Sequence, residues 1–156
     1  MSRPDESYSH GGELPEALVA SFRDQSQLDF DLAFFDSLLQ REPDYIDVLR
    51  CQGELLTRKG QHERALTIDR RLVSLLPSDS YVLYNLACSL ALLGEPQEAI
   101  AALRRSLQCG YADLDYLKID SDLDTLRGEP EYLALLSDYS VDEPSEPAGE
   151  AEAEAD

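Results

Sequence analysis

Apolar residues recur three or four positions apart along most of this chain, and that spacing places them on one face of an α-helix. The pattern is clearest between Ile46 and Gly110, where helical segments alternate with short turns that contain glycine or proline. This stretch predicts two helical hairpins laid end to end, and hence an all-α fold.

The two hairpins repeat with a period of 34 residues. Gly60 and Gly94 are one period apart, and so are Ala65 and Ala99. Each glycine follows the first helix of its hairpin, where a left-handed backbone conformation is easily reached only by glycine. Each alanine stands near the start of the second helix, where a small side chain lets the two helices pack closely.

The residue types at the spaced positions of the repeat carry a family resemblance. The first hairpin has Leu49, Gly53, Leu56, Ala65 and Pro77, and the second has Leu83, Leu86, Ala87, Leu90, Ala99 and Leu103. Together with the period, this pattern resembles the tetratricopeptide repeat. The resemblance implies a right-handed α-solenoid of about seven helices, with repeats at 46–79 and 80–113.

Four positions depart from the family pattern. Asp69 stands where a large aromatic residue is preferred, and Gln52 stands where a leucine is expected. Ser106 replaces an alanine, and Tyr111 replaces the proline that closes a repeat. The sequence is therefore not an idealised consensus array.

The residues before the repeats are interpreted as a degenerate first unit at 14–45 that follows a disordered polar tail at 1–13. The apolar spacing predicts one helix over 15–24 and a second over 28–41, with a break at 25–27 between them.

Three aromatic residues lie at helical spacing in the second of these helices: Phe30, Phe34 and Phe35. Such a stripe either packs in a core or docks a partner. We interpret it as core, which is the commoner arrangement.

The residues after Gly110 carry a weaker resemblance. Gly110, Tyr111 and Asp113 are followed by Asp120, Leu123, Leu126 and Arg127, and then by Pro130, Tyr132 and Leu135. This order is similar to the closing segment of bacterial tetratricopeptide arrays and implies a terminal cap over 114–139. Residues 140–156 contain seven acids and no base, which predicts a disordered acidic tail.

The formal net charge of −19 narrows the possible partners. Nucleic acids and anionic membranes need clustered Lys and Arg, so neither is expected to bind. The charge favours basic partners and solubility. The first residues show no apolar run of a signal peptide, and no stretch has the length of a membrane span, so a cytoplasmic location is expected.

One stretch has the carboxylate spacing of a calcium-binding loop: Asp120, Asp122, Asp124 and Glu131. Thr125 occupies the loop position that requires glycine. We therefore interpret the stretch as a turn in the cap, with acids at the positive end of a short helix.

Candidate catalytic groups are scarce. The two histidines, His10 and His62, have no cysteine partner that the sequence places beside them. The three cysteines, Cys51, Cys88 and Cys109, form no C-x-x-C pair and are an odd number, so no disulfide framework is expected. No catalytic residue, cofactor or metal is predicted, and we expect a protein without enzymatic activity.

In the tetratricopeptide family, the first helix of each repeat lines a concave groove. Carried over to this sequence, the groove residues are Asp47, Arg50, Glu54, Thr57 and Arg58 from the first repeat, and Tyr81, Tyr84, Asn85, Cys88, Ala91 and Leu92 from the second. One wall is charged and the other is aromatic and apolar, a combination that suits an extended peptide or a helix. The resemblance thus implies an adaptor that binds a protein segment.

Some members of the family clamp the C-terminal carboxylates of chaperones. Arg50 and Asn85 fit that pattern loosely, but Glu54 replaces an asparagine and would repel a carboxylate. Asp115 and Ile119 replace the bases of the third unit. Chaperone binding of this kind is therefore not expected. Two other roles remain open: self-assembly into a homo-oligomer, and a regulatory subunit that docks through the acidic tail.

Overall fold

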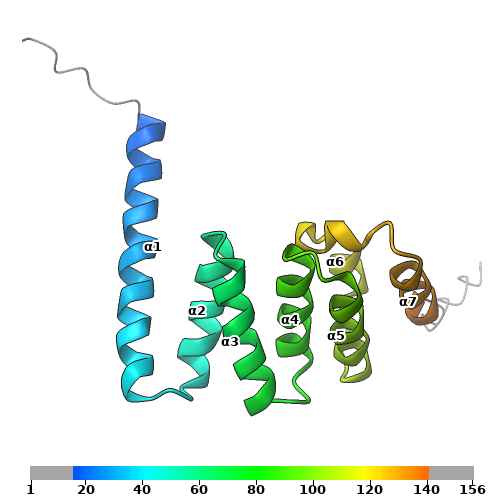
Figure 1. The fold of residues 1–156 in the computed structure, drawn as a ribbon. Coiled ribbons are helices and arrows are strands. Elements are labelled where there is room, and N and C mark those ends of the chain that lie inside the picture. Colours follow the sequence, from blue (N-terminus) through cyan, green and yellow to red (C-terminus); the bar gives the residue numbers. More distant parts are fainter. Residues whose placement is uncertain (1–15, 141–156) are drawn as a thin grey trace, which may run out of the picture.

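The computed structural model describes residues 16–140, with side chains from residue 27 to residue 139. Its helices are α1 (Glu16–Arg41), α2 (Ile46–Arg58), α3 (His62–Leu75), α4 (Ser80–Leu92), α5 (Pro96–Gln108), α6 (Leu114–Ile119), the 3-10 helix η1 (Ser121–Leu126) and α7 (Pro130–Ser140). Figure 1 shows them in a row, with α1 at one end and α7 at the other. This is the all-α helical-repeat solenoid that the sequence predicts, and it fits a tetratricopeptide-type fold.

The hairpins α2–α3 and α4–α5 turn at the predicted glycines. Gly60 has a φ of 74° and Gly94 a φ of 76°, both in the left-handed region. The predicted turns are therefore confirmed. The division of the chain at residues 45, 79 and 113 into separate units, and the role of 114–139 as a terminal cap, stay predictions.

The predicted break before residue 28 is wrong, because α1 runs through residues 25–27 without interruption. Gln25, Ser26 and Gln27 include no glycine or proline, and glutamine is a good helix former. The unit therefore contains one long helix in place of a hairpin. The predicted tail at 1–13 lies outside the described residues.

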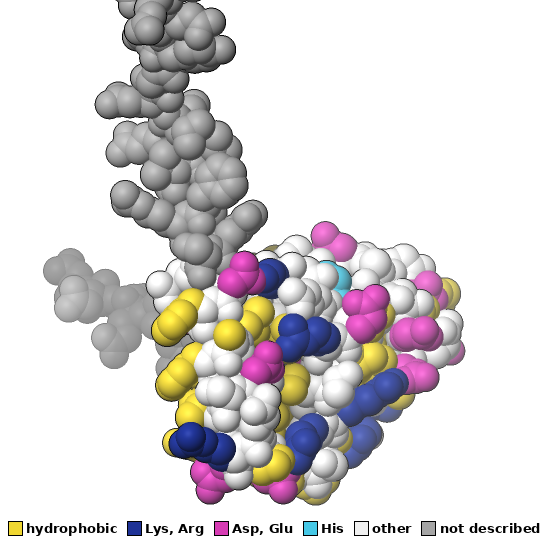
Figure 2. Space-filling view, turned by 60° about the vertical axis from the view of Figure 1, so that its left-hand side comes forward, with side chains coloured by type: hydrophobic (Ala, Val, Ile, Leu, Met, Phe, Trp, Pro, Cys, Tyr) yellow, Lys and Arg dark blue, Asp and Glu magenta, His cyan; other side chains and the backbone are white. Residues whose placement is uncertain are grey.

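The core interpretation of the phenylalanines is wrong for two of the three. Phe30 is 67% exposed and Phe34 is 50% exposed, whereas Leu32 between them is buried. Figure 2 shows hydrophobic side chains in a column along the described part of α1. The reason is the missing hairpin: α1 packs against α2 and, through Leu32 and Asp36, against α3, and among the described residues no partner helix of its own unit covers its other face.

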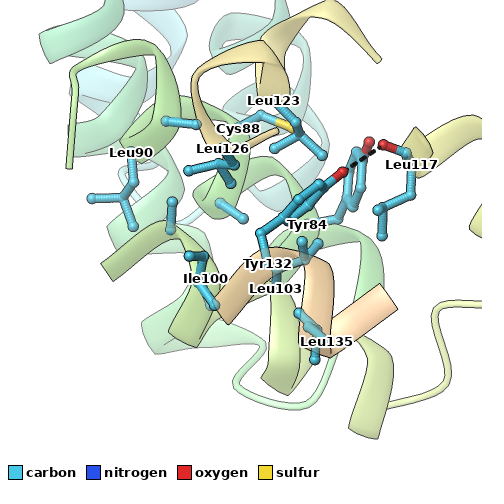
Figure 3. Close-up of a cluster of buried hydrophobic side chains, with 14 of the residues drawn as sticks. Tyr84, Cys88, Leu90, Ile100, Leu103, Leu117, Leu123, Leu126, Tyr132 and Leu135 are labelled. Atoms are coloured by element: carbon cyan, nitrogen blue, oxygen red, sulfur yellow. Dashed lines mark hydrogen bonds between the residues drawn. The ribbon is translucent and has the colours of Figure 1, made fainter. Parts of the chain in front are cut away.

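Most of the core lies between α4 and the C-terminal helices. Figure 3 shows Leu117, Leu123 and Leu126 pointing toward the side chains of α4 and α5. The Tyr132 hydroxyl donates a hydrogen bond of 3.1 Å to the Leu117 carbonyl. The segment after Gly110 is thus part of the same core as the second repeat.

The described helices do not meet the requirements for crossing a membrane. Within residues 16–140, none has both the length and the apolar content that crossing a membrane requires. The longest, α1, carries charged residues along its length.

Candidate functional site: a groove along α2 and α4

A groove of about 670 Å³ opens where α2, α4 and the segment after Gly110 meet. Eight of the eleven candidate groove residues line it: Arg50, Glu54, Thr57, Arg58, Tyr81, Tyr84, Asn85 and Cys88. The other three do not line the groove: Asp47 is exposed on α2, Ala91 is buried in α4, and Leu92 is half-buried near the end of α4.

The lining residues differ in depth. Tyr81 is 65% exposed and stands on the rim, while Tyr84 and Cys88 are buried in the floor. All three residues lie on one face of α4, because positions three and seven residues after Tyr81 share its side of the helix. The difference in depth comes from what covers that face, since Tyr111 stacks on Tyr84 and Asp120 lies against both Tyr84 and Cys88. A ligand in this groove would therefore meet Tyr81 first.

The opposite side of the groove comes from residues that the sequence analysis did not place there. We call these residues the C-terminal wall: Tyr111, Asp113, Tyr116, Asp120 and Asp122. Tyrosine and aspartate are dense between residues 111 and 122, and this density is the one signal in the sequence that could have pointed to the wall.

The tyrosines of the two sides form one aromatic cluster. The rings of Tyr84 and Tyr111 stack with centroids 4.4 Å apart and planes 3° apart. Tyr81 meets Tyr111 edge to face at 5.5 Å, and Tyr116 lies 6.4 Å from Tyr84. Aromatic pairs in these geometries contribute about 0.5–1.5 kcal/mol beyond the area they bury. The tyrosine that replaces the closing proline is therefore a packing residue.

A buried carboxylate joins the floor to the C-terminal wall. The Tyr84 hydroxyl donates to Asp120 Oδ2 at 2.6 Å, and the Asp122 amide donates to Asp120 Oδ1 at 3.0 Å. The second bond makes Asp120 the N-cap of η1. Burial and the bond to Asp120 raise the pKa of Tyr84, so its hydroxyl remains a donor.

One group in the described part of the chain has metal-ligand chemistry. The potential ligand atoms of Cys88, Asp120 and Asp122 lie within 4.8 Å of one another. Burial, and then the charge of Asp120, raises the pKa of the Cys88 thiol, which opposes the thiolate that a metal needs. Both oxygens of Asp120 also accept hydrogen bonds. The group is better described as a hydrogen-bonded network than as a metal centre.

The calcium-loop residues are likewise used within the protein. Asp120 caps η1, and Asp124 pairs with Arg127 at 2.7 Å. Glu131 lies on α7, the next helix. The interpretation of this stretch as a capped turn agrees with these contacts.

The back of the groove holds a buried acid. Asp69 of α3 is 4% exposed, and the Ser89 hydroxyl of α4 donates to it at 2.5 Å. Burial raises the pKa of Asp69 to about 6, although the bond from Ser89 acts in the other direction. Asp69, which departs from the family pattern, thus connects the two repeats.

Arg50 has a structural role as well as a place in the groove. Its guanidinium pairs with Asp79 at 2.7 Å, and Asp79 caps α4 by accepting from the Val82 amide. Partial burial acts to raise the pKa of Asp79, but the hydrogen bonds from Val82, Arg50 and Tyr81 and the charge of Arg50 together outweigh it and lower the pKa. Arg58 and Glu54 on the same helix are exposed.

The chain is similar in sequence to part of a longer protein. No protein-family model matches the chain. A chloroplastic protein of Arabidopsis thaliana is 32% identical over 103 residues, which are 64% of this chain and 29% of that protein. The chain thus spans under a third of that relative.

Two solved structures have a similar fold. "MamA 41-end" from Desulfovibrio magneticus RS-1 aligns with 80% of this chain and 73% of its own, with a TM-score of 0.56 and 16% identity. A "MamA RS-1 ArsTM double mutant" aligns with 80% of this chain and 74% of its own, with the same TM-score and 15% identity. At this identity the likeness extends to the fold alone.

Proposed function

We propose that this chain is a non-enzymatic adaptor that binds a peptide or helix segment of another protein in the groove along α2 and α4. The observation that carries the proposal is the groove itself, which is about 670 Å³ in volume and is lined by residues of both repeats and of the C-terminal wall. Its exposed aromatic rim and its charged side offer both apolar and polar anchors.

The chemistry of the lining residues favours binding over catalysis. Two cysteines line the groove: Cys88, whose pKa is raised by burial, and Cys51, which is exposed. A nucleophilic cysteine needs a lowered pKa, usually from a base beside it. No histidine lines the groove in the described part of the chain. The free cysteines suit a reducing compartment such as the cytoplasm, which completes the proposal.

Site-specific photocrosslinking tests the proposal. A benzoyl-phenylalanine replaces Tyr81 on the rim of the groove, and in a second variant it replaces Tyr45, which is 43% exposed and does not line the groove. We expect a partner protein to crosslink at position 81 and not at position 45. Equal crosslinking at both positions, or none at position 81, would contradict the proposal.

Self-assembly is a second candidate, because Phe30 and Phe34 leave an apolar surface on α1. The same crosslinker at position 34 tests it. A covalent dimer formed at position 34 and not at position 81 would favour self-assembly through α1.

A further inference from the structure

The two sides of the groove differ in charge. Its two basic residues, Arg50 and Arg58, both belong to α2. Arg50 already pairs with Asp79, so part of its charge is compensated. Three acids stand on the opposite side, in the C-terminal wall: Asp113, Asp120 and Asp122.

These three acids form no ion pair with any cationic side chain among the described residues. The seven ion pairs between described side chains use other carboxylates, such as Asp115 with Lys118 and Asp124 with Arg127. Arg127 does approach Asp120, but it donates to the backbone carbonyl at 3.1 Å. Asp113 and Asp120 accept hydrogen bonds within the protein, whereas the Asp122 carboxylate accepts none from a described residue, so Asp122 is the acid of the wall that is most open to a ligand.

The negative charge of Asp120 shifts the pKa values of two neighbouring groups, Tyr116 and Asp122. Asp120 is the largest cause of the raised pKa of Tyr116. Burial, followed by the charge of Asp120, raises the pKa of Asp122, and His62 offsets only part of this. In both shifts the negative charge of Asp120 acts on a neighbouring group.

Aromatic surface lies beside the acids. Tyr81 and Tyr116 are 65% and 48% exposed, and they flank the buried stack of Tyr84 and Tyr111. A cation gains from an aromatic face within about 6 Å of it, and gains further from a carboxylate at the same place.

We propose that the segment bound in the groove carries an arginine side chain that docks at the C-terminal wall, between the exposed tyrosines and facing Asp122, with the charge of the buried Asp120 close by. The inference rests on the proposed function, since it names the chemistry of the partner at the same site. A planar guanidinium both stacks on tyrosine and forms paired hydrogen bonds to a carboxylate. The net charge of −19 adds long-range attraction for a basic partner.

Charge also disfavours two other occupants of the groove, the chain's own C-terminal residues and a second copy of the chain. Residues 140–156 of this chain contain seven acids and no base, so the C-terminal wall would repel them. A second copy of the chain brings the same large negative charge.

The test begins with selection of random twelve-residue peptides displayed on phage, with the full chain as bait. We expect the selected peptides to be enriched in arginine and to lose binding to Tyr81→Ala. Peptides that bind in the groove without arginine would overturn this inference and leave the proposed function standing. If no peptide binds in a manner that Tyr81→Ala weakens, the proposed function fails as well.

The selected peptide then serves as the probe in a fluorescence anisotropy titration. We expect Arg→Gln in the peptide, or Asp122→Asn in the protein, to weaken binding by about tenfold or more. The two changes together should weaken it little further, because they remove the same contact. Asp115→Asn is the matched control, since that side chain is 92% exposed and outside the groove.

Three other results would overturn the inference. A lysine peptide that binds as tightly as the arginine peptide would remove the assignment to a guanidinium. Selection of acidic peptides resembling residues 140–156 would identify the chain's own tail as the occupant. A dimer in sedimentation that Asp122→Asn dissociates would identify a second copy.

Discussion

The Tyr84 hydroxyl lies 2.6 Å from the Asp120 carboxylate and donates a hydrogen bond to it across 36 residues of sequence. Tyr84 belongs to α4, and Asp120 stands at the start of η1. Because the same carboxylate caps η1, this single buried acid connects the second repeat to the segment that follows it in the chain. This bond, together with the packing of Leu117, Leu123 and Leu126 in the shared core, holds the second side of the groove in place.

Removal of the Tyr84 hydroxyl should destabilise the protein. In Tyr84→Phe the buried Asp120 loses one donor, and the free energy of unfolding should fall by about 1–2 kcal/mol. Urea denaturation followed by circular dichroism measures this. Tyr116→Phe is the control, because its ring is half exposed, and it should change stability little. Equal midpoints for the two variants would contradict the role assigned to the bond.

Asp69 should make stability depend on pH. Its pKa is about 6 in the folded protein and 3.8 ordinarily, so the folded state binds the proton more tightly. The wild type should therefore lose on the order of 3 kcal/mol as the pH rises from below 4 through 6. Asp69→Asn, which stays neutral, should be more stable than the wild type at pH 8 and nearly equal to it at pH 4.

Urea denaturation at both pH values gives that comparison. Asp115→Asn removes one exposed acid and controls for the general effect of net charge. A difference between Asp69→Asn and the wild type that is the same at pH 4 and pH 8 would show that Asp69 does not carry the dependence.

Two glycines should respond to alanine in opposite directions. At Gly60 the φ of 74° strains an L side chain, so Gly60→Ala should cost about 1–2 kcal/mol. At Gly53 in α2, a new Cβ would lie 3.4 Å from Ile68 Cγ2, an ordinary contact. Gly53→Ala should therefore be neutral or stabilising by up to about 1 kcal/mol, through helix propensity.

Thermal unfolding of the two variants separates these outcomes. A loss of stability in Gly53→Ala as large as that in Gly60→Ala would mean that α2 and α3 pack more closely than the structure has them.

The face that α1 presents to the protein can be tested by substitution. Leu32→Ala should lower the free energy of unfolding by about 2–3 kcal/mol, because Leu32 is 4% exposed. A Phe30→Ser, Phe34→Ser double variant should change it by less than about 1 kcal/mol, since both rings are largely exposed. Urea denaturation at low protein concentration measures both. A larger loss in the double variant would place the phenylalanines in a core.

The register of the groove could be predicted from the sequence because it depends on the helix period. Once the repeat places α2 and α4 side by side, the residues of one face follow by counting turns, and eight of the eleven candidates line one groove. Binding at these residues stays a prediction. The C-terminal wall could not be derived in this way, because η1 and the short α6 do not follow the repeat.

The departures from the family pattern show the same limit. Gln52 is buried and donates to Asp36 of α1, and the Ser106 hydroxyl donates to the Ser80 carbonyl at 2.7 Å. In the sequence each was an exception with no stated cause. The partner of each is 16 to 26 residues away along the chain, so only the packed structure identifies it.

The sequence by itself determined the helices of the repeats, their turns at Gly60 and Gly94, and the helix faces that meet. These features depend on residues within one or two helical turns, where backbone preference and apolar spacing decide the outcome. The tertiary structure alone decided that Phe30 and Phe34 are exposed, that Asp69 has Ser89 as its partner, and that a buried Asp120 closes the groove. Burial and hydrogen bonding of a side chain depend on elements that are far away in the chain. A local sequence pattern does not identify those elements.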